Sequence, residues 1–313
     1  MTFSEGLETI GEGAFRRIAN TKLTLPDSLT TIGKEAFSGC DNLAEVVTGE
    51  NLITIGDNAF DPNYVKSLTS IDLSKSQKLS TIGAYAFTGT RLTEIIIPDS
   101  VTNIGDYAFD DCSNLVNVKL SDNLTSIGNA AFRNTPIASI EIPDGVKTIG
   151  SDAFKRCKNL TKIVIPHSVI SLGSAAFFEC TSLTAVDISG ESLTLSGSDV
   201  FRPCPITHVH IPKRVPVSYF AGSYSLPADE SCFFQIGADG KCPAAYCPFR
   251  DGDKATGDVN GDGKLNNTDI ILLGRAYMAG DGDKYLAVAD MNNDGRITNA
   301  DIILLGRLYM TGK

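Results

Sequence analysis

The sequence has no tryptophan and only three histidines, so it is poor in sugar-stacking rings and in acid–base groups, which argues against an enzyme. No apolar run reaches the ~18 residues that a membrane span needs. The opening residues, MTFSEGLETIGEGAF, lack the basic and apolar regions of a signal peptide. The net charge of −10 argues against nucleic-acid binding, which needs a basic surface.

Glutamate is absent from residues 251–313, although this segment contains ten aspartates. Glutamate is the better helix former, so the bias indicates a specific use for short carboxylates. The whole chain is 42% hydrophobic and 20% charged, which is ordinary for a folded protein and excludes general disorder. Its 313 residues predict about two domains.

A phrase of the form I-G-x-x-A-F recurs along the first two thirds of the chain. Its closing phenylalanines, including one degraded copy, are Phe15, Phe37, Phe60, Phe87, Phe109, Phe132, Phe154, Phe177 and Phe201. They follow one another at steps of 22 to 27 residues, which defines nine units. One such unit cannot bury its own apolar face, so neighbouring units must stack.

A second phrase, such as LTKIVIP (160–166), lies between these copies. Side chains alternate along a strand, so Ile163 and Ile165 are expected to point inward and Val164 outward. Pro166 lacks an N–H for the ladder and should end the strand. We expect the Gly of each I-G pair to permit a tight turn, and the phenylalanines to stack inside. The pattern predicts a parallel, β-rich solenoid.

The outward strand positions form a mixed stripe with no aromatic row and no single charge sign. They are Glu94, Ile96, Asn117, Lys119, Ser139, Glu141, Lys162, Val164, Ala185, Asp187, His208 and His210. This face is either a partner site or an ordinary solvated surface. His208 and His210 share it as a metal pair would, but no third ligand is evident, so we expect them to be surface residues.

Five cysteines, Cys40, Cys112, Cys157, Cys180 and Cys204, each follow a repeat phenylalanine by three residues. This spacing predicts buried free thiols on an interior ladder. Cys232, Cys242 and Cys247 lie outside the repeats, where one disulfide is possible without a defined pairing. The adjacent acids Asp110 and Asp111 are expected in a loop rather than as a catalytic pair, and no G-x-S-x-G, H-E-x-x-H or P-loop motif occurs.

Residues 1–212 resemble the BspA-type leucine-rich repeat of bacterial surface proteins. The resemblance implies a right-handed leucine-rich-repeat solenoid, a secreted or surface-displayed binding protein, and no common catalytic activity. Residues 213–257 break the repeat; the apolar cluster at 232–236 predicts a cap over the last coil, followed by a connector at 250–257. The chain begins part-way into a repeat, so we expect a fragment whose secretion signal lies upstream.

Two twelve-residue loops, DVNGDGKLNNTD (258–269) and DMNNDGRITNAD (290–301), place oxygens at positions 1, 3, 5, 9 and 12 with Gly at position 6. Calcium takes six to eight oxygen ligands from such a loop. The expected ligands of two Ca²⁺ ions, with carbonyls at Lys264 and Arg296, are Asp258, Asn260, Asp262, Lys264, Asn266, Asp269, Asp290, Asn292, Asp294, Arg296, Thr298 and Asp301. The alternative, chance turns rich in Asp and Asn, is weakened because 15 of 23 aligned positions are identical between 258–280 and 290–312.

Each loop is followed by an apolar helical pattern but is not preceded by one. This arrangement, duplicated over residues 258–313, resembles a type I dockerin, which implies docking to the cohesin domain of a scaffoldin in a cellulosome or related extracellular complex. The predicted module is small and α-helical, and calcium should supply part of its folding energy.

The exposed helix faces are expected to contact cohesin. They carry Asn267, Thr268, Ile271, Arg275 and Met278 in one half and Asn299, Ala300, Ile303, Arg307 and Met310 in the other. The resemblance implies that cohesin is contacted by the residues at loop positions ten and eleven and by Arg275 and Arg307. Alternatively, each arginine is simply a charged residue on a solvated helix surface. Glycine precedes each arginine where many dockerins have Lys, and position eleven differs between Thr268 and Ala300.

We therefore expect a secreted, non-catalytic cellulosome-type component. Its dockerin binds cohesin in a calcium-dependent way, and its repeats bind a protein or surface partner. The alternative is an accessory part of a larger polysaccharide-degrading enzyme whose catalytic module is absent from this sequence. Neither nucleic-acid binding nor a membrane span is expected.

Overall fold

The computed structural model describes residues 3–61, 67–188, 193–195, 199–212, 226 and 233–236. The chain divides into two units, Met1–Gln235 and Ile236–Lys313, and the description below concerns the first. The calcium loops and helices predicted for residues 258–313 lie outside the described residues, as do Cys232, Cys242 and Cys247. The boundaries at 212 and 257 therefore stay predictions.

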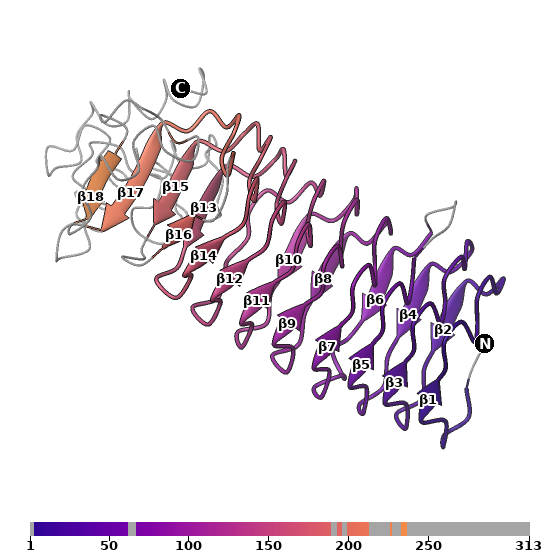
Figure 1. The fold of residues 1–313 in the computed structure, drawn as a ribbon. Helices are drawn as coiled ribbons and strands as arrows, with labels where there is room; N and C mark the ends of the chain where they lie inside the picture. The colour runs from indigo at the N-terminus through magenta and orange to yellow at the C-terminus, as the bar shows by residue number, and fades with distance from the viewer. Residues whose placement is uncertain are drawn as a thin grey trace, which may run out of the picture. The chain divides into compact units, whose positions relative to one another are not determined.

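One face of this unit is a nine-stranded parallel sheet whose strands are each two residues long (Figure 1). In spatial order they are β1 (Thr9–Ile10), β3 (Thr31–Ile32), β5 (Thr54–Ile55), β7 (Thr81–Ile82), β9 (Asn103–Ile104), β11 (Ser126–Ile127), β12 (Thr148–Ile149), β14 (Ser171–Leu172) and β16 (Thr194–Leu195). From β1 to β14, each ends on the apolar residue that precedes the repeat glycine, and β16 ends on Leu195. From Ile10 to Leu172 that residue is at most 2% exposed, so it anchors each coil in the core.

The second set of strands is called the front sheet here and forms a second row along the coils (Figure 1). All of them come from the phrases between the phenylalanine turns, except β18, which follows the repeats. The front sheet has three separate parts. They are β2 (Lys22–Thr24), β4 (Glu45–Val47) and β6 (Ser70–Asp72); β8 (Glu94–Ile96) and β10 (Asn117–Lys119); and β13 (Lys162–Ile165), β15 (Ala185–Ile188), β17 (His208–Pro212) and β18 (Phe233–Ile236). The registered pairs are parallel, such as Lys162↔Ala185 and Ala185↔His208. The parallel solenoid predicted from the repeats is confirmed.

The alternation expected within β13 is also confirmed. Ile163 and Ile165 are 1% and 0% exposed, whereas Val164 between them is 44% exposed. The strand ends at Ile165, immediately before Pro166. Period-two alternation therefore sends each I-x-I pair into the core and leaves the central residue on the front sheet.

The predicted phenylalanine ladder runs through the core from Phe15 to Phe201. Neighbouring rings have centroids 5.3–5.7 Å apart and planes within 11° of parallel. From Phe37 onward every ladder ring is at most 4% exposed. Each ring covers the face of its neighbour, so burial of one coil depends on the next.

The turn around each phenylalanine forms a backbone ladder that the sequence did not predict. Tyr107, Phe109 and Asp111 donate their N–H groups to the carbonyls of the next coil, at 2.7–2.9 Å. Tyr107 and Asp111 have φ angles of 59° and 56°, and the equivalent residues of other coils are also left-handed. The ladder requires this conformation, which costs about 1 kcal/mol per non-glycine residue.

The structure gives a reason other than turn flexibility for the glycine of each I-G pair. Gly128 and Gly173 do not have positive φ. A Cβ atom at Gly128 would lie 2.6 Å from the carbonyl carbon of Gly105, and one at Gly173 would lie 2.3 Å from the backbone nitrogen of Ser151. Glycine is therefore needed because successive coils approach too closely for any side chain.

Candidate binding surfaces

The outward face of the front sheet is the first candidate site. Most positions predicted to face outward do so: Glu94, Ile96, Asn117, Lys119, Ser139, Glu141 and Val164 are exposed, and Lys162 and Asp187 are partly exposed. The prediction is wrong for Ala185, His208 and His210, which are 1%, 6% and 3% exposed. The outward face is therefore partly covered at β15, where Asp187 alone keeps some exposure, and is covered at the two histidines of β17.

The two histidines are buried because other side chains cover them, so the expectation of surface residues is wrong. The ring of His208 stacks on Phe234 of β18, with centroids 4.3 Å apart. His210 makes a 2.8 Å contact through Nδ1 with Oδ2 of Asp187. Burial, and then the neighbouring His210, lower the pKa of His208 to about 4. The pair is part of the packing between β15, β17 and β18.

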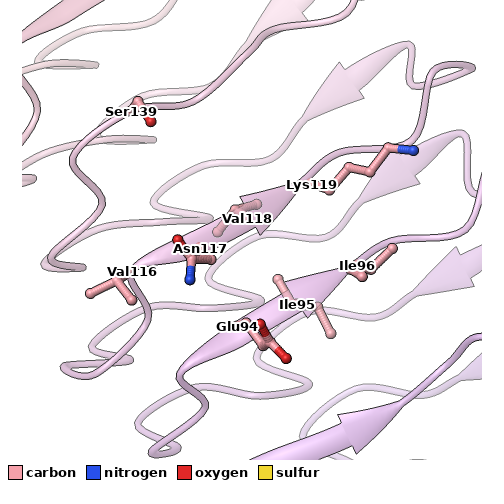
Figure 2. A pocket seen from close by; sticks show the side chains of 8 residues that line it. All are labelled: Glu94, Ile95, Ile96, Val116, Asn117, Val118, Lys119 and Ser139. Atoms are coloured by element: carbon pink, nitrogen blue, oxygen red, sulfur yellow. The ribbon is translucent and has the colours of Figure 1, made fainter. Parts of the chain in front are cut away.

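A hollow of about 300 Å³ opens on the front sheet where the outward face is exposed (Figure 2). Its lining residues come from β8, β10 and the next coil: Glu94, Ile95, Ile96, Val116, Asn117, Val118, Lys119 and Ser139. We call it the front groove. It lies beside an interruption of the front sheet, because residues 135–143 form no strand.

The front groove combines apolar and charged surface. Ile96 is 63% exposed and Val116 43% exposed, the two most exposed apolar side chains of its lining. Glu94 and Lys119 are both exposed, and neither has an ion-pair partner within the described part of the chain. Such a surface can pack an extended polypeptide on Ile96 and Val116 and pair one charge of each sign.

Val116 is a lining residue that the sequence reasoning missed. It follows Leu115, one position before the predicted outward residue Asn117. The equivalent position holds threonine in other coils, such as Thr93 and Thr161, and those residues are exposed. That polar column is the signal that identifies the position as solvent-facing.

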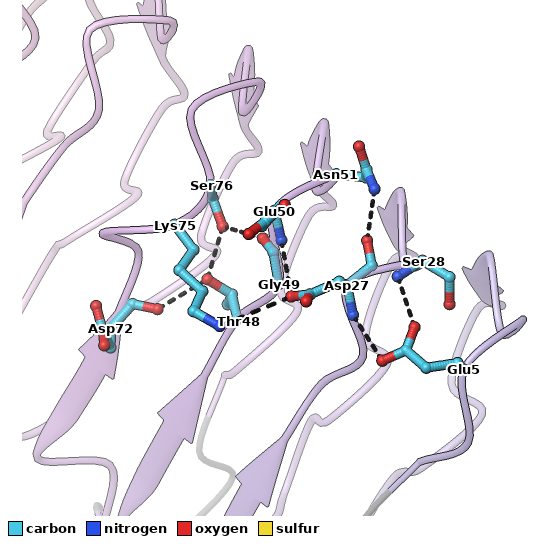
Figure 3. A network of polar contacts seen from close by, with 10 residues as sticks. All are labelled: Glu5, Asp27, Ser28, Thr48, Gly49, Glu50, Asn51, Asp72, Lys75 and Ser76. Atoms are coloured by element: carbon cyan, nitrogen blue, oxygen red, sulfur yellow. Dashed lines mark hydrogen bonds and ion pairs between the residues drawn. The ribbon is translucent and has the colours of Figure 1, made fainter.

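A polar ridge follows the first coils, where each front strand turns toward the next short strand (Figure 3). Glu5 accepts the backbone N–H groups of Asp27 and Ser28 at 3.3 and 3.2 Å. Farther along, the Thr48 and Ser76 hydroxyls lie 2.7 Å apart, and Ser76 donates to the Gly49 carbonyl at 2.9 Å. These side chains satisfy turn backbone groups, so the ridge holds coils together and is not a reaction site.

The carboxylates Asp110 and Asp111 lie in a turn, as expected. Asp110 accepts from Nε and Nη2 of Arg133, each at 2.7 Å, and Asp111 accepts from Asn134 at 2.7 Å. Both acids are therefore engaged by the next coil. Across the residues that the structure describes, no group of three His, Cys, Asp or Glu side chains is arranged to hold a metal ion.

The predicted thiol ladder is confirmed. Cys40, Cys112, Cys157, Cys180 and Cys204 are free, and only Cys204 is partly exposed. Each thiol donates to the carbonyl of the ladder phenylalanine one coil before, for example Cys157 to Phe132 at 3.3 Å. Burial raises the pKa of Cys157 to about 11, so this thiol stays protonated.

The residues predicted to bind calcium and cohesin all lie outside the described residues, so their positions stay predictions. Within the described residues, no helix is long and apolar enough to cross a membrane.

Comparison with known proteins supports both the predicted leucine-rich repeats and the predicted dockerin. The family described as "BspA type Leucine rich repeat region" matches residues 1–116 and 106–226 in six copies, and "Dockerin type I domain" matches residues 256–308. No curated protein matches the chain. Both matched families are non-catalytic modules, and no catalytic domain is detected.

Several solved structures are similar. A leucine-rich repeat protein from Bacteroides ovatus is 28% identical over 65% of this chain and 58% of its own, with a TM-score of 0.52. A leucine rich cell surface protein from Faecalibacterium prausnitzii is 24% identical, covering 72% of this chain and 84% of that one, with a TM-score of 0.39. A leucine-rich repeat protein from T. pallidum is 28% identical, with 57% and 74% covered and a TM-score of 0.39.

The match to the Bacteroides protein supports the leucine-rich repeat fold, and this chain spans 58% of that protein's length. The repeat match extends over residues 1–226, well over half of the chain, and agrees with the coils of the structure. The chain belongs to the BspA-type leucine-rich repeat family and carries a type I dockerin domain near its C-terminal end.

Proposed function

We propose that this chain is a secreted, non-catalytic component of a cellulosome-type or cell-surface complex. Its dockerin attaches it to a scaffoldin cohesin, and its solenoid binds a protein or surface partner through the front groove. The observation that carries the proposal is the fusion of a type I dockerin to a solenoid with an open front sheet. Solenoids commonly present such faces to partners.

Calcium would be held by the two loops at 258–269 and 290–301. Each offers carboxylate and amide or hydroxyl oxygens plus one carbonyl, which is the hard donor set that Ca²⁺ prefers. Each loop would bind one Ca²⁺ ion, so the chain would bind two. When bound, the ions would draw the loop ends together and order the helices that follow them.

Cohesin recognition would use matching helix faces. Asn267 and Arg275 in one half correspond to Asn299 and Arg307 in the other, so either half can present a similar surface. Loss of one arginine should weaken binding modestly, because the other half can replace it. Loss of both should weaken binding by more than the sum of the two single effects.

The test is calorimetric titration of the full chain with type I cohesins, in calcium and in EDTA. Arg275→Ala and Arg307→Ala are measured singly and together, with the exposed solenoid residue Arg91 changed to Ala as the control. Binding in calcium that disappears in EDTA supports the proposal. Binding that persists in EDTA, or no binding to any cohesin, contradicts it.

The solenoid's role is tested with variants of the full chain. Ile96→Asp charges the front groove, whereas Ile53→Asp changes an exposed isoleucine beside β5 that is outside the groove. A partner captured from culture supernatant should be lost by the first variant and kept by the second. If both variants retain the partner equally, the front groove is not its binding site.

The alternative role, as accessory part of a larger polysaccharide-degrading enzyme, predicts association with a catalytic chain and no turnover by this one. Incubation of the full chain with plant polysaccharides distinguishes catalysis from binding. Product release by this chain would overturn the non-catalytic assignment, whereas binding without turnover supports it.

A further inference from the structure

The end of the thiol ladder differs from the rest because three cysteines occupy successive coils. Cys157, Cys180 and Cys204 each follow a ladder phenylalanine by three residues. Earlier on the ladder, Cys112 lies between coils that carry Thr90 and Thr135 at this position. The hydroxyl of Thr90 lies 3.3 Å from the Cys112 sulfur, and that of Thr135 lies 3.3 Å from the Cys157 sulfur.

The last two cysteines of the ladder, Cys180 and Cys204, are placed for direct contact. Phe177 and Phe201, which precede them, stack with ring centroids 5.3 Å apart and planes 6° from parallel, so the coils are in register. The Cys180 and Cys204 thiols donate to carbonyls of successive coils, at 3.1 and 3.2 Å, and therefore point the same way. A disulfide joins Cα atoms about 4.4–6.8 Å apart, a range that contains this coil spacing.

The Cys180 and Cys204 thiols differ in solvent exposure and in pKa. Cys180 is fully buried and Cys204 is partly exposed, so a soluble oxidant reaches Cys204 first. The hydrogen bond between them raises the pKa of Cys180, to which burial adds, and lowers the pKa of Cys204. The thiolate is the reactive form, so both properties favour Cys204 as the first site of oxidation.

We propose that Cys180 and Cys204 form an oxidisable pair that closes into a disulfide between the last two coils when the chain meets a peroxide. The Cys204 thiolate attacks one peroxide oxygen, the O–O bond breaks, and sulfenic acid and hydroxide result. The Cys180 sulfur then attacks the Cys204 sulfur, the S–OH bond breaks, and its thiol proton leaves with the hydroxyl as water. Two thiols are oxidised and one peroxide is reduced to two waters.

The buried position of Cys180 does not prevent the second step, because its reaction partner is its neighbour rather than a solute. Cys157 also neighbours Cys180, but it is buried and hydrogen-bonded to Thr135, so it is less accessible to a soluble oxidant than Cys204. The bond would close a loop of about 24 residues, which restricts the unfolded chain and should raise the Tm of the solenoid by roughly 5 °C.

The test treats the full chain with equimolar hydrogen peroxide, alkylates remaining thiols, and maps cross-linked peptides by mass spectrometry. The expected product joins the peptides that carry Cys180 and Cys204, and it disappears on reduction. Cys112→Ser, which changes a ladder thiol whose neighbouring coils carry threonine at this position, should leave the product intact. Cys204→Ser should abolish it. Cys180→Ser should stop the reaction at a sulfenic acid on Cys204 that dimedone traps.

Circular dichroism and thermal melting of each variant report whether it folds. If Cys180→Ser does not fold, the smaller change Cys180→Ala takes its place. Cross-linking of Cys180 to Cys157, pairing of either residue with Cys232, Cys242 or Cys247, or unreacted thiols after treatment would each overturn the proposal. None of these measurements depends on cohesin or on the solenoid's partner, so the result is independent of the proposed function.

Discussion

Arg133 and Asp110 form a bidentate ion pair between successive coils, with Nε–Oδ1 and Nη2–Oδ2 distances of 2.7 Å. The Arg133 guanidinium also lies over the ring of Tyr107, with Cζ 5.3 Å from the ring centroid, and Tyr107 stacks on Tyr85. The hydrogen bonds that Arg133 donates to Asp110 raise the pKa of Arg133. Asp110 is only 7% exposed, so the two hydrogen bonds from Arg133 replace the contacts with water that its carboxyl group loses on burial.

Replacing Arg133 with Ala should lower the free energy of unfolding by about 2 kcal/mol, because the Asp110 carboxylate would remain buried without its partner. Arg156→Ala is the matched control, since its pair with Glu179 is more exposed, and it should cost less than about 1 kcal/mol. Urea titrations of the two variants measure both effects. If the two variants lose the same free energy of unfolding, burial of the Asp110 carboxyl group does not explain the effect.

Phe132→Ala should lower the free energy of unfolding by roughly 3–5 kcal/mol, because it removes one ring from the middle of the phenylalanine ladder. Phe178→Ala is the control: this ring is partly exposed, outside the ladder, and should cost far less. Thermal melting of both variants checks the prediction. A Phe132→Ala melt indistinguishable from that of the unmodified chain would mean that the ladder carries little stability.

Gly128→Ala should destabilise the solenoid by about 3 kcal/mol or prevent folding, because the new Cβ would overlap the backbone of the previous coil. Gly11 occupies the same repeat position in the first coil, where nothing lies within 4 Å of an added Cβ. Gly11→Ala should therefore change stability by less than about 0.5 kcal/mol. Melting temperatures of the two variants distinguish coil packing from a general intolerance of alanine.

Acid should weaken the packing around β17. His208 has a pKa of about 4 in the fold but an ordinary value near 6.5 when unfolded, so between these values the unfolded chain binds more protons. Stability should fall as pH decreases from about 6.5 to 4, by up to about 3 kcal/mol. The nearby His210–Asp187 pair also faces this residue.

The variant His208→Phe keeps an aromatic ring against Phe234 and removes the titrating group. Its urea midpoint should lose most of the dependence on pH in this window, while the unmodified chain keeps it. An unchanged pH dependence would assign the effect to other groups.

Chelation of calcium should affect only the predicted dockerin. With EDTA, far-UV circular dichroism should lose a minor helical contribution, because a module of this size depends on metal for folding energy. The solenoid has no metal-binding cluster among its described residues, so its melting transition should stay unchanged. An unaltered helical signal in EDTA would contradict the calcium assignment.

The sequence alone determined the features that repeat. Period-two alternation and the recurring glycine and phenylalanine predict the parallel coils, the inward Ile163 and the thiol ladder, because each follows from a local rule that recurs from repeat to repeat. The paired Asp-rich loops predict two calcium sites in the same way, because their ligand spacing is contained within twelve residues, and their duplication carries the resemblance to a dockerin.

Only the tertiary structure decided what depends on neighbours distant in sequence. Alternation placed His208 and His210 on the outward face, but both are buried: His208 stacks on Phe234 of β18, and His210 contacts Asp187 of β15. The front groove likewise lies where residues 135–143 form no strand beside β10. Repeat periodicity specifies the direction of a side chain; whether another segment covers it depends on packing that no single repeat encodes.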